Sequence, residues 1–96
     1  IKSSEVDWVE AADYYVCLHV GPKSHLLRRS MTDLEQDLDP ATFCRIHRSY
    51  IINKEKIREM HRHFSGRYLF VMDDKALTRI TSGRTYQDVF RSEFGL

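Results

Sequence analysis

Short apolar segments separated by turn residues are the feature that most restricts the folds open to this chain. The segments are rich in β-branched and aromatic residues, and pairs such as Gly21-Pro22 and Ser65-Gly66 end them. We predict strands over residues 6–10, 14–20, 26–28, 57–63, 68–72 and 76–81, and extended chain over 43–52 with a kink or loop near 47–49. The pattern contains neither βαβ alternation nor the helix pair of a helix-turn-helix. The predicted fold class is therefore mostly β and antiparallel.

Two short helices complete this pattern. Ser30 is a suitable N-cap, with Asp33 three residues later, and the helix should end before Pro40 because a residue that precedes proline disfavours helical geometry. Acidic residues occupy its outer face, so it should point away from any polyanion. Residues 85–94 carry aromatic and aliphatic side chains at helical spacing and predict a second, amphipathic helix.

Composition limits the chain to one small globular domain over residues 1–96, with 42% hydrophobic and 30% charged residues. Its apolar runs are far shorter than the roughly 18 residues that a membrane span needs, and no signal peptide is visible. Cys17 and Cys44 fit neither a metal spacing nor a disulfide framework, which favours a reducing cytoplasm. His61 and His63 lack a third ligand at metal-site spacing. We therefore expect no metal, no cofactor and no enzymatic activity.

The charges are unevenly distributed, although the net charge is only +1. Residues 41–67 hold seven basic and two acidic side chains, a local charge of +5, with three histidines in the same stretch. Residues 32–40 hold four acidic side chains and no basic one. This asymmetry favours a surface for a polyanion, and the alternative is a solvated basic face without a partner.

Residues 43–53, FCRIHRSYIIN, resemble the signature of the LytTR family of bacterial DNA-binding domains. Residues 6–16 resemble the opening segment of that family and residues 83–86, GRTY, its closing motif, so the resemblance extends over 6–94. It implies an elongated arrangement of small antiparallel sheets with two short helices. The usual first strand of the family would be truncated here, at residues 1–4. Gly83 separates Ser82 from Arg84, where family members often have the serine directly before the arginine.

The resemblance implies that loops, rather than an inserted helix, read successive major grooves of the double helix. Its base-contacting positions correspond to Arg48, Arg84 and the loop at 13–15, where we favour Tyr14 and expect the other tyrosine to pack in the core. Arginine can form two hydrogen bonds to guanine, which discriminates by roughly 1–3 kcal/mol. Predicted contacts to the DNA backbone are Ser49, Lys54, Lys56 and Ser82. Predicted to brace the loops are Arg45, His47 and Asn53.

The family also implies a biological setting. The chain would be the output domain of a bacterial response regulator in a two-component system, with an N-terminal regulatory domain, a receiver, outside this sequence. Two copies would occupy repeated half-sites on double-stranded DNA in the cytoplasm, without membrane contact. The isolated domain would be monomeric or weakly associating.

The competing hypothesis is a protein-interaction module that uses an exposed sheet edge. Salt dependence separates the two, because about five phosphate contacts predict a slope of log K against log salt near −4 to −5. RNA binding is disfavoured, since the sequence shows no aromatic stacking platform.

Overall fold

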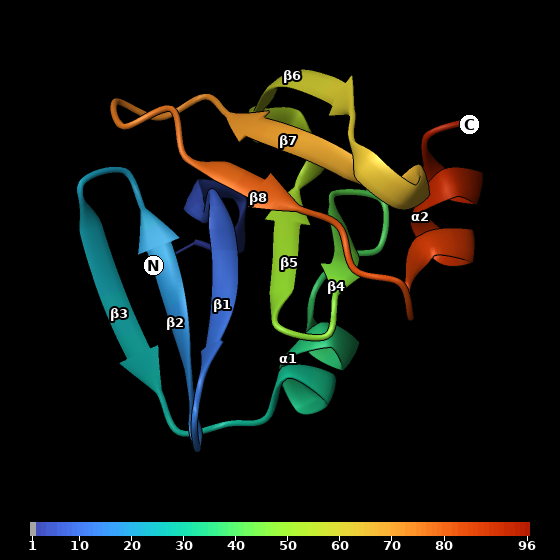
Figure 1. Cartoon of the computed structure of the whole chain (residues 1–96). Coiled ribbons are helices and arrows are strands. Elements are labelled where there is room, and N and C mark those ends of the chain that lie inside the picture. The colour runs from blue at the N-terminus through green and yellow to red at the C-terminus, as the bar shows by residue number, and fades with distance from the viewer. Residues whose placement is uncertain (1) are drawn as a thin grey trace.

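Eight strands form two antiparallel sheets in the computed structural model, which describes residues 2–96 (Figure 1). The larger sheet has the order β3-β2-β1-β5-β4 and the smaller one β6-β7-β8. The larger sheet contains β1 (Trp8–Ala12), β2 (Tyr15–Val20), β3 (Lys23–Leu27), β4 (Phe43–His47) and β5 (Tyr50–Asn53). The smaller sheet contains β6 (Ile57–Arg62), β7 (Tyr68–Met72) and β8 (Arg79–Thr81). The prediction of a mostly β, antiparallel fold is confirmed.

The two predicted helices are present. In α1 (Met31–Asp37), the Ser30 hydroxyl accepts a hydrogen bond from the Asp33 backbone N–H at 3.1 Å, as the capping pattern predicts. The second, α2 (Gln87–Glu93), is shorter at both ends than predicted. Each α-helix is only seven residues long, and no helix within residues 2–96 could cross a membrane. Three 3-10 turns, η1, η2 and η3, cover Ser3–Glu5, Lys54–Lys56 and Phe64–Gly66.

The loop alternative at residues 47–49 is confirmed, because β4 and β5 pair across a turn at Arg48-Ser49, with a register irregularity between Arg45 and His47. The prediction for residues 76–81 needs correction, because this segment contains only the three residues of β8. Its first half is a loop in which the Asp74 carboxylate accepts hydrogen bonds from the backbone and hydroxyl of Thr78, at 2.8 and 2.6 Å.

A hydrophobic cluster packs on each face of the larger sheet. On one face, β7, β8 and α2 pack against β4 and β5 around the fully buried Phe70 and Phe90. On the other face, α1 packs against β1, β2 and β5 through Met31 and Leu34. Since strand side chains alternate between the faces, β5 contributes Ile52 to the first cluster and Ile51 to the second.

The predicted elongation is slight. The extents along the principal axes are 32 × 27 × 24 Å, and the radius of gyration of 12.5 Å is about that of a compact domain of this length. Before β1, the described residues form the turn η1 rather than a strand. Ile1, with which the truncated strand would begin, lies outside the described residues.

Candidate nucleic-acid interface

Two of the three predicted DNA-contacting loops lie at the same end of the larger sheet. The β1–β2 turn at Asp13-Tyr14 and the β4–β5 turn at Arg48-Ser49 are side by side because β1 pairs with β5. The Ala11 backbone N–H donates to the Ser49 carbonyl at 2.9 Å and so connects the two turns. Both turns are at the lower edge of the larger sheet in Figure 1.

The third loop, between β8 and α2, docks on the β4–β5 hairpin through Gly83. Its backbone N–H donates to the Ile46 carbonyl at 2.8 Å. A Cβ atom at this glycine would lie only 2.6 Å from Cδ2 of His47, so the close approach requires that residue 83 have no side chain. Arg84 follows directly and is exposed. The glycine that departs from the usual family spacing therefore brings Arg84 close to the hairpin that carries Arg48.

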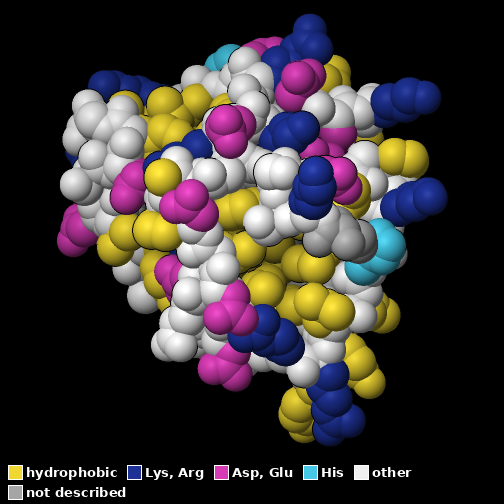
Figure 2. Space-filling view, turned by 180° about the vertical axis from the view of Figure 1, so that it is seen from behind, with side chains coloured by type: hydrophobic (Ala, Val, Ile, Leu, Met, Phe, Trp, Pro, Cys, Tyr) yellow, Lys and Arg dark blue, Asp and Glu magenta, His cyan; other side chains and the backbone are white. Residues whose placement is uncertain are grey.

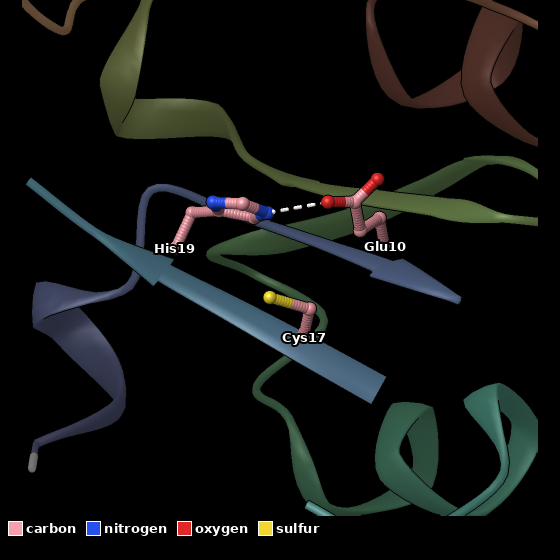
Figure 3. Close-up of side chains that lie close together, drawn as sticks. All are labelled: Glu10, Cys17 and His19. Carbon is pink, nitrogen blue, oxygen red and sulfur yellow. Dashed lines mark hydrogen bonds and ion pairs between the residues drawn. The ribbon is translucent and has the colours of Figure 1, made fainter. Parts of the chain in front are cut away.

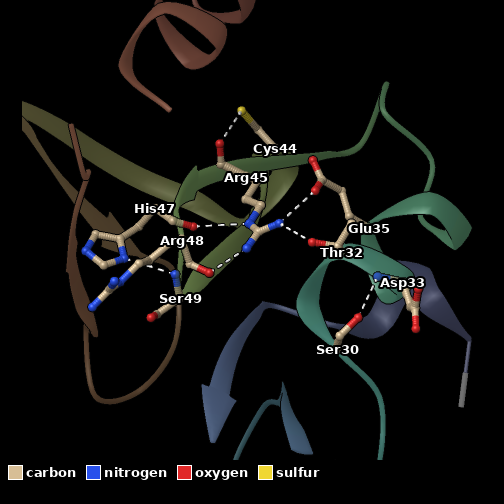
Figure 4. A network of polar contacts seen from close by, with 9 residues as sticks. All are labelled: Ser30, Thr32, Asp33, Glu35, Cys44, Arg45, His47, Arg48 and Ser49. Carbon is tan, nitrogen blue, oxygen red and sulfur yellow. Dashed lines mark hydrogen bonds and ion pairs between the residues drawn. The ribbon is translucent and has the colours of Figure 1, made fainter. Parts of the chain in front are cut away.

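A buried guanidinium connects α1 to this hairpin. Arg45 is 9% exposed, and it donates to the carbonyls of Arg48 at 2.6 Å and His47 at 3.4 Å (Figure 4). It also contacts Glu35 and Thr32 of α1 at 3.1 and 3.3 Å. Its Cζ lies 4.7 Å from the centre of the Tyr86 ring, just before α2. These contacts compensate the positive charge of Arg45, whose burial without partners would be costly. They also connect the β4–β5 turn to α1, as bracing of this loop requires.

His47 orders the β4–β5 turn as a neutral imidazole. Its Nδ1 accepts a hydrogen bond from the Ser49 backbone N–H at 3.0 Å, which places the ring proton on Nε2. Burial lowers the pKa of His47 below its usual 6.5, and the neighbouring cations Arg48, Arg67 and Arg45 lower it further. The side chain of Arg48 is exposed and extends away from this network (Figure 4).

The predicted residues Asn53, Lys54 and Lys56 lie at the end of β5 opposite the Arg48 turn. The four extended residues of β5 separate the two ends by about 13 Å. Asn53 is buried, and its side chain donates to the Val6 carbonyl and accepts from the Glu55 backbone N–H, both at 2.9 Å. It therefore caps η2 and does not contact the Arg48 turn. The Lys54 ammonium is paired with Glu93 at 2.7 Å. Lys56 lines a hollow of about 450 Å³ with four acidic residues, Glu5, Asp7, Asp73 and Asp74.

Two details of the predicted site are wrong. Ser82 is 1% exposed, and its hydroxyl accepts from the Tyr68 backbone N–H at 2.9 Å, so it is a core residue that phosphate cannot reach. Neither tyrosine near the β1–β2 turn packs in the core, because Tyr14 is 80% and Tyr15 40% exposed. Tyr14 belongs to the two-residue turn, in which Asp13 is in the left-handed region at φ +57°, and Tyr15 is the first residue of β2.

Sequence reasoning missed a basic hollow beside these loops. Arg62, His63 and Arg67, around the β6–β7 turn, line about 200 Å³ together with Arg91 of α2. The Gln87 side chain donates to the Gly66 carbonyl at 2.8 Å and fixes α2 against the turn. The positive run at 41–67 includes two of the arginines, but Arg91 comes from a distant segment whose approach only the fold reveals.

The exposed acidic residues of α1 and the unpaired arginines near the loops lie on different elements of the fold. Within residues 2–96, seven arginines make no ion pair or side-chain hydrogen bond, and five of these lie on the loops or line the basic hollow, namely Arg48, Arg62, Arg67, Arg84 and Arg91. From behind, Figure 2 shows acidic and basic side chains interspersed over this face, with several basic ones projecting at its margins. The exposed acidic residues Asp33, Glu35 and Asp37 belong to α1, which packs on the face of the larger sheet opposite β7 and α2.

Comparisons with known proteins show the family and the fold of this chain. The family profile described as the LytTr DNA-binding domain matches residues 1–95. The transcriptional regulatory protein LytR of Staphylococcus aureus is 37% identical over 96 residues, which are the whole chain and 38% of that protein. A response regulatory protein of Vibrio cholerae is 35% identical over 95% of the chain and 35% of its own length. The CO-responsive transcriptional regulator RcoM of Rhodospirillum rubrum is 32% identical over 88% of the chain and 35% of its own length.

A solved structure matches the fold closely. It is the LytTr DNA-binding domain of a protein described as a methyl-accepting/DNA response regulator from Bacillus cereus, with a TM-score of 0.90. The match covers all of this chain and 86% of that one at 24% identity, which supports the fold. The chain spans little more than a third of the length of the regulators named above.

Proposed function

The chain belongs to the family of LytTr DNA-binding domains, and we propose that it reads specific double-stranded sequences through its three loops. The observation that carries this proposal is the docking of the β8–α2 loop on the β4–β5 hairpin through Gly83. It holds two exposed arginines, Arg48 and Arg84, on adjoining loops, and neither side chain has a polar partner among residues 2–96. Each guanidinium can bond O6 and N7 of a guanine in the major groove.

Tyr14 supplies a third contact in this proposal. It projects from the β1–β2 turn at the same end of the sheet as Arg48, and its ring and hydroxyl are free to meet a base edge or a sugar. Three contacts on separate loops would set both the register and the orientation of the domain on the duplex.

Phosphate contacts come from Ser49 and from the basic hollow at Arg62, Arg67 and Arg91. The arginines of the hollow are exposed and lie beside the β8–α2 loop, because the Ser82 backbone N–H donates to the carbonyl of Tyr68, the neighbour of Arg67, at 2.9 Å. They replace Lys54 and Lys56, which face carboxylates at the other end of β5. Phosphate contacts position the protein, and most of the sequence-independent affinity comes from them.

The wider setting of the domain is part of the proposal. The relatives are named as transcriptional or response regulators, and most of their length lies outside this domain. An N-terminal receiver whose phosphorylation pairs two chains would raise the effective concentration of the second domain at a neighbouring half-site. The domain itself, monomeric or weakly associating, would then act in the cytoplasm as the output of a transcription regulator and would catalyse no reaction.

Selection from a randomised duplex library tests the base contacts. The wild-type chain should enrich one motif, and Arg48→Ala and Arg84→Ala should each lose preference at one position of a half-site. Arg58→Ala is the matched control, because Arg58 is an exposed arginine of β6 in the smaller sheet and is paired with Asp73 at 3.7 Å. The base-reading role is wrong for an arginine whose removal lowers affinity but leaves the motif unchanged.

The alternative of a protein-interaction module has one supporting observation. The edge strand β3 exposes Leu26, at 63%, and Leu27. Binding of a peptide there would depend weakly on salt, whereas DNA binding should fall steeply as salt rises.

A further inference from the structure

A second cluster of polar side chains lies on the β1–β2 hairpin, on the strands that lead to the Tyr14 turn. Glu10 of β1 is directly opposite Cys17 of β2, and His19 follows two residues later on the same face of the sheet. The carboxylate, thiol and imidazole ligand atoms all lie within 4.8 Å of one another (Figure 3). We propose that Glu10, Cys17 and His19 bind a divalent cation of the Zn²⁺ class.

The donor set suits such an ion. Zn²⁺ accepts thiolate sulfur, imidazole nitrogen and carboxylate oxygen at about 2.0–2.3 Å, so the ligand atoms of a tetrahedral site are about 3.3–3.8 Å apart. The observed cluster needs a contraction of about 1 Å, which side-chain rotation can provide. One thiolate and one carboxylate neutralise the ion, and the thiolate disfavours the hard cations Ca²⁺ and Mg²⁺.

The surroundings hold the imidazole in place. The Trp8 ring stacks on His19 with the ring centres 3.8 Å apart and the planes 8° from parallel. Nε2 of His19 lies 2.8 Å from Oε1 of Glu10, so a proton is shared between them in the metal-free protein. The ion would take the place of this proton.

Binding of the metal ion releases one proton from the site. The neutral imidazole moves its proton to Nδ1, the Cys17 thiol releases one proton to solvent, and the metal forms bonds to nitrogen, sulfur and oxygen. His19 and Glu10 are partly exposed, with side chains at 23% and 35%, so water can complete the fourth position. A spacing rule could not reveal this site, because its ligands come from two strands joined by a turn.

Metal binding would cross-link the hairpin that carries Tyr14. Glu10 and Cys17 are cross-strand partners two pairs away from the last pair before the turn, Ala12 and Tyr15. An ion that bridges them stabilises the folded chain, because the unfolded chain does not hold the three ligands together.

Cobalt substitution tests the proposal on the purified 96-residue chain with its cysteines reduced. One equivalent of Co²⁺ should produce a thiolate-to-cobalt charge-transfer band and the intense visible absorption of four-coordinate cobalt. Zn²⁺ should then abolish both, because it binds such sites more tightly. The absence of the charge-transfer band in excess Co²⁺ would overturn the proposal, as would its persistence after Zn²⁺ addition.

Variants assign the ligands. Cys17→Ser should remove the charge-transfer band, whereas Cys44→Ala, which alters a buried cysteine of β4 in the hydrophobic cluster around Phe70 and Phe90, should retain it. His19→Gln should weaken Co²⁺ binding at least about tenfold. Urea unfolding of each variant checks that it folds. A band that survives in folded Cys17→Ser, or that is lost only in folded Cys44→Ala, would refute the assignment.

Discussion

The substitution Gly83→Ala tests whether the two arginine-bearing loops depend on close backbone packing. The new Cβ would lie 2.6 Å from Cδ2 and 3.1 Å from Cγ of the His47 ring, distances that force a shift. The backbone of Gly83 is not in the left-handed region, so this steric conflict is the main effect. Overpacking of this kind destabilises by about 1–3 kcal/mol, and each kcal/mol lowers the Tm of a domain this size by about 4–8 °C.

DNA affinity should fall beyond this loss of stability. A shift of the β8–α2 loop moves Arg84 relative to Arg48, and the loss of one arginine–guanine pair costs about 1–3 kcal/mol. That corresponds to a 5- to 140-fold weaker Kd at about 1.4 kcal/mol per tenfold. Fluorescence anisotropy with the selected duplex, at a temperature where the variant is folded, measures this change directly.

Two further variants isolate the cause. In a His47→Ala background the obstacle is gone, so Gly83→Ala should cost less, with a coupling energy of about 1 kcal/mol or more. Gly21→Ala is the matched control: its φ of +56° makes alanine cost about 1 kcal/mol, but its Cβ meets no atom within 4 Å and DNA binding should not change. If Gly83→Ala matches wild-type stability and affinity, or if its cost is the same without His47, the reasoning is refuted.

Three other predictions follow from the interface and its supports. Arg67→Ala should weaken binding to all duplexes and flatten the slope of log K against log salt by about 0.9, whereas Lys54→Ala should leave the slope unchanged; equal slopes would place the phosphate path elsewhere. NMR titration should give His47 a pKa below 6.5. The stability that the neutral imidazole contributes should be complete above pH 6.5 and should be lost as pH falls through the pKa of the folded state. A measured pKa above 6.5 would contradict a neutral imidazole. Ser82→Ala should destabilise the fold by about 1–3 kcal/mol, because it leaves the Tyr68 N–H buried without an acceptor, while the salt slope stays the same; a changed slope would return Ser82 to the interface.

Local chemistry explains why much of the fold was predictable. The Ser30 cap, the strand at Tyr68–Met72 and the Gly21-Pro22 turn each depend on a few neighbouring residues, and the structure contains all three. The resemblance to the family points to Arg48 and Arg84, and both are exposed on loops. Their contacts with bases stay a prediction.

Features set by tertiary packing were not predictable from the sequence. Strand β8 has only three residues, so its alternation is too short to show whether the following residue, Ser82, points inward. The prediction puts Ser82 at the surface, whereas it is in the core. Residues 48 and 54 are close in sequence, yet the length of β5 puts Lys54 beside Glu93 and away from the arginine loops. Arg91 joins the basic hollow only because α2 packs against the smaller sheet.

The most direct measurement is a crystal structure of this chain bound to the duplex that selection enriches. The account predicts that the guanidinium groups of Arg48 and Arg84 lie within hydrogen-bonding distance of base edges in the major groove, with the basic hollow along a phosphate strand. A complex in which both arginines face solvent, or in which a helix occupies the groove instead, would contradict it.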